Sequence, residues 1–175
     1  MMPSPLVLEM AIREISTQCT FAEIAYSNIG QKSTNGEDGL FSSIHSFLSH
    51  CAMISKFLRS KHIKGSDDEY IAKILGITSS YKINNRAFRD TLEHYDEYLA
   101  EWVSRHGENV NIMDYCIAHE GAVIGSNMVK VRVYNPSTKI YTLIDEKTDL
   151  NKLYEEAIDI RGKADSWIKD NTRWQ

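Results

Sequence analysis

Three side chains that can act on charged substrates lie within one short segment: Arg89, Asp90 and His94. Arginine presents a fork of hydrogen-bond donors that matches phosphate oxygens, and histidine exchanges protons near neutral pH. On a helical wheel these polar groups fall on the face opposite Phe88 within a predicted helix from Asn85 to Arg105. The segment therefore predicts a cation and a proton carrier on the polar face of one helix.

The same polar face also has a purely structural interpretation. Arg86 and Asp90 are opposite charges four residues apart, as are Arg89 and Glu93. Each such pair stabilises a helix by about 0.2–0.5 kcal/mol. From spacing alone, an ordinary solvated helix face is the favoured interpretation of these charges.

The string Arg89-Asp90-Thr91-Leu92-Glu93-His94 resembles the signature of the HEPN superfamily, in which four residues separate an arginine from a histidine. The wider run from Asn85 to Glu97 is similar to the motif helix of uncharacterised bacterial members, and the resemblance covers about an eighth of the chain. It implies a helical bundle. It also implies metal-independent cleavage of RNA, or binding of RNA or a nucleotide, in a stress, defence or toxin–antitoxin module with an antitoxin-like protein partner.

The resemblance implies that Arg89 and His94 are catalytic and that Asp90 supports them, without a cofactor. RNA is cleaved without a metal when its own 2′-hydroxyl attacks the adjacent phosphorus, which requires a proton carrier and a cation at the phosphate. Imidazole and guanidinium groups suit these two roles. Family members commonly have Asn at the position of Asp90, and an acid beside a phosphate is less favourable than an amide.

A single copy of this helix makes a poor site. Arg89 and His94 lie about 140° apart around a continuous helix, so they flank the polar face without converging. The resemblance implies that two motif helices meet in a homodimer and build one shared cleft. A second candidate contact surface is the segment from Leu40 to Ser55, which contains no Asp, Glu, Lys or Arg, although burial in the core explains this lack of charge as well.

Basic residues near the end of that uncharged helix are candidates for RNA binding. The candidate RNA contacts are Lys56, Arg59, Lys61 and Arg86. Cations at a helix C-terminus also complement the helix dipole, so a capped helix end in solvent is the favoured interpretation of the first three. The formal net charge of −4 argues against broad electrostatic capture of nucleic acid.

Other motifs give weaker predictions. His45 and His50 miss the four-residue spacing that lets two helical histidines hold one metal, and Cys116 with His119 has no second pair of ligands. The run 121–125 lacks the third glycine of a dinucleotide fingerprint, and Ser126 has no nucleophile-elbow context. We therefore expect no metal. The aromatic residues Tyr95, Tyr98 and Trp102 allow a small-ligand site, but core residues are the simpler interpretation.

Apolar periodicity predicts a mainly α protein. Helices are expected from Pro5 to Ile29, from Leu40 to Ser60 and over 85–105, with a last helix opened by Asp149. A Ser66–Glu69 capping box begins a short helix that Gly76 ends. The polar stretch from Gly30 to Gly39 is expected to be a loop.

The region of about 110–146 is predicted to form strands instead of helices. Asn111–Ala118 is a possible short strand, and alternating valines over 129–133 precede a turn at 135–138 and a return strand over 139–145. The sequence thus predicts an up-down, HEPN-like bundle of four long helices and one short one. A small antiparallel hairpin, with a third strand beside it as an open alternative, is inserted before the last helix, in a single domain over 1–175.

Composition places the chain among ordinary globular proteins, with 42% hydrophobic and 25% charged residues. The three cysteines lie in apolar stretches without a paired spacing, which favours buried thiols in a reducing compartment. No signal segment or membrane span is evident, so we expect a cytoplasmic protein without membrane contact. A non-catalytic interaction protein of the same architecture is the alternative function.

Overall fold

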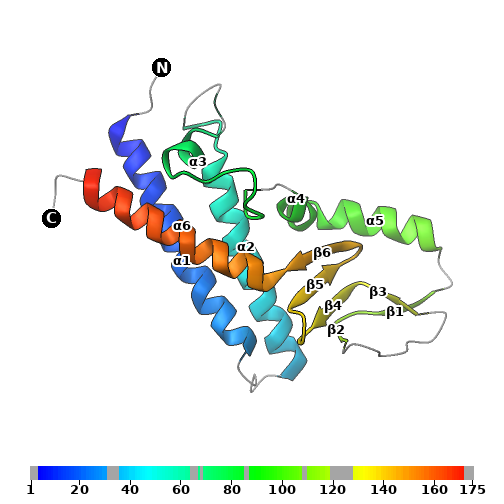
Figure 1. Cartoon of the computed structure of the whole chain (residues 1–175). Helices are drawn as coiled ribbons and strands as arrows, with labels where there is room; N and C mark the ends of the chain where they lie inside the picture. The colour runs from blue at the N-terminus through cyan, green and yellow to red at the C-terminus, as the bar shows by residue number, and fades with distance from the viewer. Residues whose placement is uncertain are drawn as a thin grey trace. The chain divides into compact units, whose positions relative to one another are not determined.

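The computed structural model describes residues 4–30, 36–63, 67, 69–84, 87–107, 110–118 and 128–171, without the side chains of residues 87–89. These residues form six helices and six short strands, so the described chain is mainly helical, as predicted (Figure 1). They divide into two compact units, residues 1–86 with 153–175 and residues 87–152, each of which is described by itself. The expectation of one domain stays a prediction.

Three long helices form the first unit. They are α1 (Pro5–Gly30), α2 (Gly36–Leu58) and α6 (Leu150–Asn171), of which α6 begins in the second unit and continues through the first. In Figure 1, α1 and α2 lie side by side and run in opposite directions. The predicted apolar stripe of α1 is confirmed over most of its length. Its buried side chains are Ala11, Ile12, Ile15, Cys19, Ala22, Ala25 and Ile29.

Polar and aromatic contacts join α6 to α1. The ring of Tyr154 stacks on that of Tyr26, with 4.2 Å between centroids. Further along α6, Arg161 forms an ion pair with Glu23, and Asp165 accepts a hydrogen bond from Ser16. Because residue numbers rise along α6 as they fall along α1, the two helices are antiparallel.

Two helix boundaries differ from the prediction. Helix α2 begins at Gly36, so part of the expected loop over 30–39 is helical, and residues 31–35 lie outside the described residues. The short helix α3 (Tyr70–Ile74) has Glu69 at its N-cap position without a side-chain capping bond. Ser66 lies outside the described residues. At the other end Gly76 adopts φ 65°, a left-handed conformation that glycine reaches without strain.

The second unit contains α4 (Ala87–Glu93), α5 (Tyr95–His106) and two small sheets. The first sheet pairs β1 (Asn111–Met113) with β3 (Met128–Lys130) in parallel. The second has the order β2 (Cys116–Ile117), β4 (Arg132–Asn135), β5 (Ile140–Leu143) and β6 (Glu146–Asp149). Strands β4 and β5 are antiparallel around the predicted turn, but β2 pairs with β4 in parallel, and β6 was not predicted. The sheet region therefore exceeds a simple hairpin.

A compact hydrophobic cluster holds α5 to this sheet region. Trp102, Val131 and Ile144 are buried together, with Tyr95 and Leu99 packed against them. Ile144 has φ 58° in the turn between β5 and β6, where a β-branched residue is strained. Its side chain is nevertheless buried, and its N–H donates to the Val131 carbonyl at 2.7 Å. Burial of the side chain offsets the backbone cost.

His50 ties α2 to α1 in the first unit. Its Nδ1 lies 2.8 Å from Oε1 of Gln18, and its ring contacts that of Phe21 with 5.4 Å between centroids. Partial burial penalises the charged imidazolium and lowers the pKa of His50 below its ordinary value. The folded protein therefore favours neutral His50.

This lowered pKa predicts a pH-dependent stability. As the pH is lowered through about 6.5, His50 takes up a proton in the unfolded chain before it does so in the folded protein. The free energy of unfolding should therefore decrease as the pH decreases, and it should level off below the pKa of His50 in the folded protein. Urea denaturation between pH 7.5 and pH 4.5 should show a smaller fall for His50→Gln than for wild type. The exposed His45 provides the control, because His45→Gln should retain the wild-type fall. Equal falls in all three proteins would contradict this role of His50.

Candidate functional site

The predicted motif helix is interrupted at His94. Instead of one helix over 85–105, α4 ends at Glu93 and α5 begins at Tyr95, with His94 at φ −115° and ψ 31°. Backbone hydrogen bonds still cross the junction, from His94 N to Asp90 O at 2.9 Å and from Tyr98 N to His94 O at 3.1 Å. The angle of about 140° between Arg89 and His94 assumed a continuous helix, so it does not describe this junction.

The imidazole of His94 faces solvent and contacts a carboxylate. Its side chain is 53% exposed, and Nδ1 lies 3.2 Å from Oε1 of Glu97, one turn further along. When Nδ1 carries the proton and donates it to this carboxylate, the lone pair of Nε2 is left available to accept another proton. The sequence prediction assigned Asp90 a supporting role and did not single out Glu97, which the structure places beside the ring.

For Arg86 and Arg89 the structure gives no side-chain position, and for Asp90 it gives a main-chain contact. The backbone of Arg89 belongs to α4, but its side chain lies outside the described residues, as does all of Arg86. Asp90 is half-buried and accepts the His94 N–H through its main-chain carbonyl. The proximity of Arg89 to His94, and the role of Asp90, therefore stay predictions.

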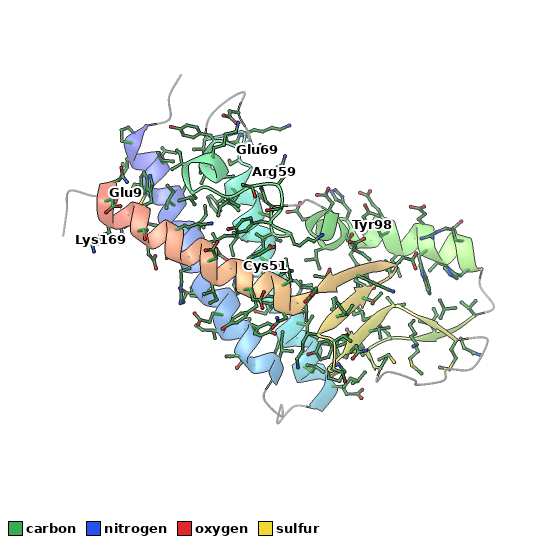
Figure 2. The ribbon with its side chains drawn as sticks, in the orientation of Figure 1. Glu9, Cys51, Arg59, Glu69, Tyr98 and Lys169 are labelled. Carbon is green, nitrogen blue, oxygen red and sulfur yellow. The ribbon has the colours of Figure 1, made fainter. Side chains whose placement is uncertain are left out.

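The candidate RNA-binding cations at the end of α2 have different environments. Arg59 is largely buried, forms an ion pair with Glu69 at 3.1 Å and donates to the Asn84 carbonyl at 3.2 Å (Figure 2). These contacts fasten the end of α2 to α3 and to the turn at Asn84, which gives Arg59 a structural role. Lys56 and Lys61 are exposed. RNA binding by this cluster stays a prediction that depends mainly on the two lysines.

The aromatic residues considered for a small-ligand site have separate roles. Trp102 is only 1% exposed and belongs to the hydrophobic cluster of the second unit, where Tyr95 packs against it. Tyr98 is 40% exposed on α5 and is labelled in Figure 2. The core interpretation is therefore confirmed for Trp102, and Tyr95 is half-buried against that residue, but the interpretation is wrong for the exposed Tyr98.

A stacked arginine in the second unit was not predicted. The guanidinium of Arg132 lies 5.0 Å from the ring centroid of Tyr95 and 4.9 Å from that of Tyr115, and it forms an ion pair with Asp114. Burial raises the pKa values of Tyr95 and Tyr141 nearby. Both aromatic rings and the carboxylate already engage this cation, which indicates a structural role. The sequence showed Arg132 only as a polar position in an alternating strand.

A polar cluster beside an open groove in the first unit was also missed. Nζ of Lys163 lies 2.8 Å from Oδ2 of Asp159, and the Tyr81 hydroxyl donates to that carboxylate while accepting from Lys163. These hydrogen bonds lower the pKa of Asp159 and raise that of Lys163. The groove has a volume of about 680 Å³ and is lined by Ile74, Leu75, Ile158, Asp159, Gly162, Lys163, Ser166 and Trp167. Since the charges of Lys163 and Asp159 compensate each other, this pair gives the groove no net charge for a ligand.

Within the described ranges, no cluster of three or more His, Cys, Asp or Glu side chains is arranged to hold a metal ion. No helix in the described part of the chain has the length and apolarity needed to cross a bilayer. Cys19 and Cys51 are buried free thiols, and burial raises the pKa of Cys19 to about 12, so this thiol is unreactive at neutral pH.

Comparison of the chain with protein-family models, curated proteins and solved structures gives no match. The roles of individual residues therefore depend on the chemistry of the chain itself.

Proposed function

We propose that this chain is a HEPN-like endoribonuclease that needs no metal and acts as a homodimer, with Arg89 and His94 in the working roles. The observation that carries the proposal is the exposure of the His94 imidazole and its contact with a carboxylate. Its imidazole is solvent-exposed at the α4–α5 junction and has a carboxylate beside Nδ1. An exposed proton carrier five positions after an arginine is the arrangement that the resemblance implies.

The chemistry follows from these groups. With Nδ1–H directed to Glu97, Nε2 of His94 accepts the proton of the RNA 2′-hydroxyl as its oxygen attacks the adjacent phosphorus. The bond from phosphorus to the 5′-oxygen breaks, and that oxygen takes up a proton. The products are a 2′,3′-cyclic phosphate and a 5′-hydroxyl end. The Arg89 guanidinium stabilises the charge that develops on the phosphate oxygens.

Cleavage of RNA in the presence of EDTA tests the proposal. The purified full chain should produce fragments with 2′,3′-cyclic phosphate and 5′-hydroxyl ends, and Arg89→Ala should lower the rate by about 100-fold or more. The control is Arg105→Ala on α5, because Arg105 pairs with Asp145 at 3.2 Å and has no assigned role in cleavage.

The outcome separates enzyme from interaction protein. Cleavage that depends on Arg89 and not on Arg105 supports the nuclease. If the wild-type protein leaves RNA intact in EDTA, or if Arg89→Ala cuts as fast as wild type, the nuclease proposal is wrong. The non-catalytic interaction protein then becomes the better interpretation of the motif helix.

A further inference from the structure

Helix α1 exposes a line of large apolar side chains on the face opposite its buried stripe. The exposed fractions are 66% for Leu6, 59% for Met10, 44% for Phe21 and 55% for Ile24. At 100° per residue these four positions fall within about 60° of one another, and the arc widens to about 80° when Arg13 and Thr17, which lie between them along the helix, are included. The face extends over about 27 Å of helix.

This face is large enough to be an interface. A large apolar side chain presents about 200 Å² when fully accessible, so these four residues expose on the order of 450 Å² per copy. Monomers rarely expose apolar patches much above this size, and two such faces bury roughly 900 Å², near the lower limit for a specific dimer.

The order of residues along the face is self-complementary in the antiparallel direction. Leu6 and Ile24 lie nine positions before and after Ile15, and Arg13 and Thr17 lie two positions before and after it. A two-fold axis that crosses the exposed face at the level of Ile15 therefore places Leu6 of one copy opposite Ile24 of the other. It also brings Met10 close to Phe21. Such reciprocal pairing is what a symmetric dimer requires.

The polar residues in the middle of the face favour antiparallel over parallel packing of the two α1 helices. In a parallel pair Arg13 would meet its own copy, which places like charges together, whereas the antiparallel pair sets Arg13 against Thr17. Arg13 Nε donates to Glu9 at 2.9 Å, and the Thr17 hydroxyl donates to the Arg13 carbonyl at 3.0 Å, so each polar side chain keeps one partner within its own helix.

We propose that the exposed face of α1 is a contact surface between two copies of this chain, separate from the meeting of motif helices that the resemblance implies. In it two α1 helices pack antiparallel about an axis at the level of Ile15. The proposal depends on α1 alone and stands whether or not RNA is cleaved. The charges of α1 disfavour other occupants. Three glutamates and one arginine on this helix repel RNA phosphates and anionic lipid headgroups.

Sedimentation of the full chain tests the surface with two matched variants. Ile24 and Ile112 are the same residue type, 55% and 56% exposed, but Ile112 lies on β1 in the other unit. Wild type and Ile112→Asp should sediment as dimers at micromolar concentration, and Ile24→Asp should raise the dissociation constant by 100-fold or more, with an unchanged circular dichroism spectrum. A wild-type monomer, or a dimer that Ile24→Asp leaves intact, would overturn the proposal.

Cysteine cross-linking tests the direction with variants that keep the face apolar. In a Cys116→Ser background, proteins with Leu6→Cys and Ile24→Cys should form a disulfide-linked dimer when mixed and oxidised, while each alone should remain uncrosslinked. Cross-linking of each variant with itself would indicate parallel helices and refute the antiparallel arrangement. Binding to anionic vesicles with loss of the dimer would identify a lipid surface as the occupant instead.

Discussion

Replacing His94 with alanine should lower the rate of RNA cleavage by about 100-fold or more, the factor that a positioned proton carrier usually contributes. Stability should change little, because the side chain is mostly exposed and its recorded polar contact is with the exposed Glu97. Rates measured on a short RNA in EDTA, with thermal unfolding in parallel, separate the two effects. His45→Ala removes an exposed histidine on α2 and should cut RNA as wild type does.

Variants of the two neighbouring acids refine the expectation for His94. If Glu97 orients the ring, Glu97→Gln should lower the rate, because the neutral amide oxygen is a weaker acceptor than the carboxylate for the hydrogen bond from Nδ1–H of His94. Asp90→Asn should preserve or raise the rate, since it removes a negative charge near the phosphate. The reverse result would return the orienting role to Asp90. Full activity in His94→Ala would remove histidine from the mechanism altogether.

Trp102→Ala should destabilise the protein by about 3–5 kcal/mol, the usual cost of removing a buried indole. Trp102 is 1% exposed, packs with Val131 and Ile144, and its carbonyl accepts a hydrogen bond from the His106 ring at 2.9 Å. The cluster is small, so few neighbours are available to fill the cavity. Urea denaturation followed by circular dichroism measures the loss.

Tyr98→Ala supplies the comparison on the same helix. Tyr98 is 40% exposed, so its removal should change the free energy of unfolding by about 1 kcal/mol or less. Similar losses for both variants would show that α5 does not depend on the indole. A loss below about 1 kcal/mol for Trp102→Ala would contradict the proposed importance of the cluster.

The long helices were predictable because burial on one side imposes a repeat of three and four residues. Ile12, Ile15 and Cys19 follow this repeat on α1, and all three are buried. The N-terminal limit at Pro5 was also correct, because proline suits the first helical turn. Asp149 caps α6 by accepting from the Lys152 N–H at 3.0 Å, as its residue type suggested.

The interruption at His94 was not predictable from the same repeat. Apolar residues on either side of it, such as Leu92, Tyr95 and Leu99, keep helical spacing, and neither proline nor glycine marks the break. The prediction of the strands was incomplete for a different reason. Segments of two to four residues carry too little periodicity, and pairing between distant strands leaves no local signal.

Only part of the candidate site could be identified from residue types. His94 was identified correctly as exposed, because it fell opposite the apolar face of the wheel. The i−4 and i+3 positions are both one turn from His94, so residue types alone did not single out Glu97, which the structure shows beside the ring. The supporting role of Asp90 stays a prediction. The Arg132–Tyr95 contact joins residues 37 positions apart, which only the folded chain brings together.

The two turns that flank β5 differ in their tolerance of added sequence. Between β4 and β5, Ser137 and Thr138 are exposed, so a tag inserted there would disturb little beyond the bonds from their N–H groups to Asn135. Between β5 and β6, one added residue would withdraw Ile144 from its contacts with Trp102. Epitope insertion or circular permutation should therefore succeed at the first turn and unfold the second unit at the other.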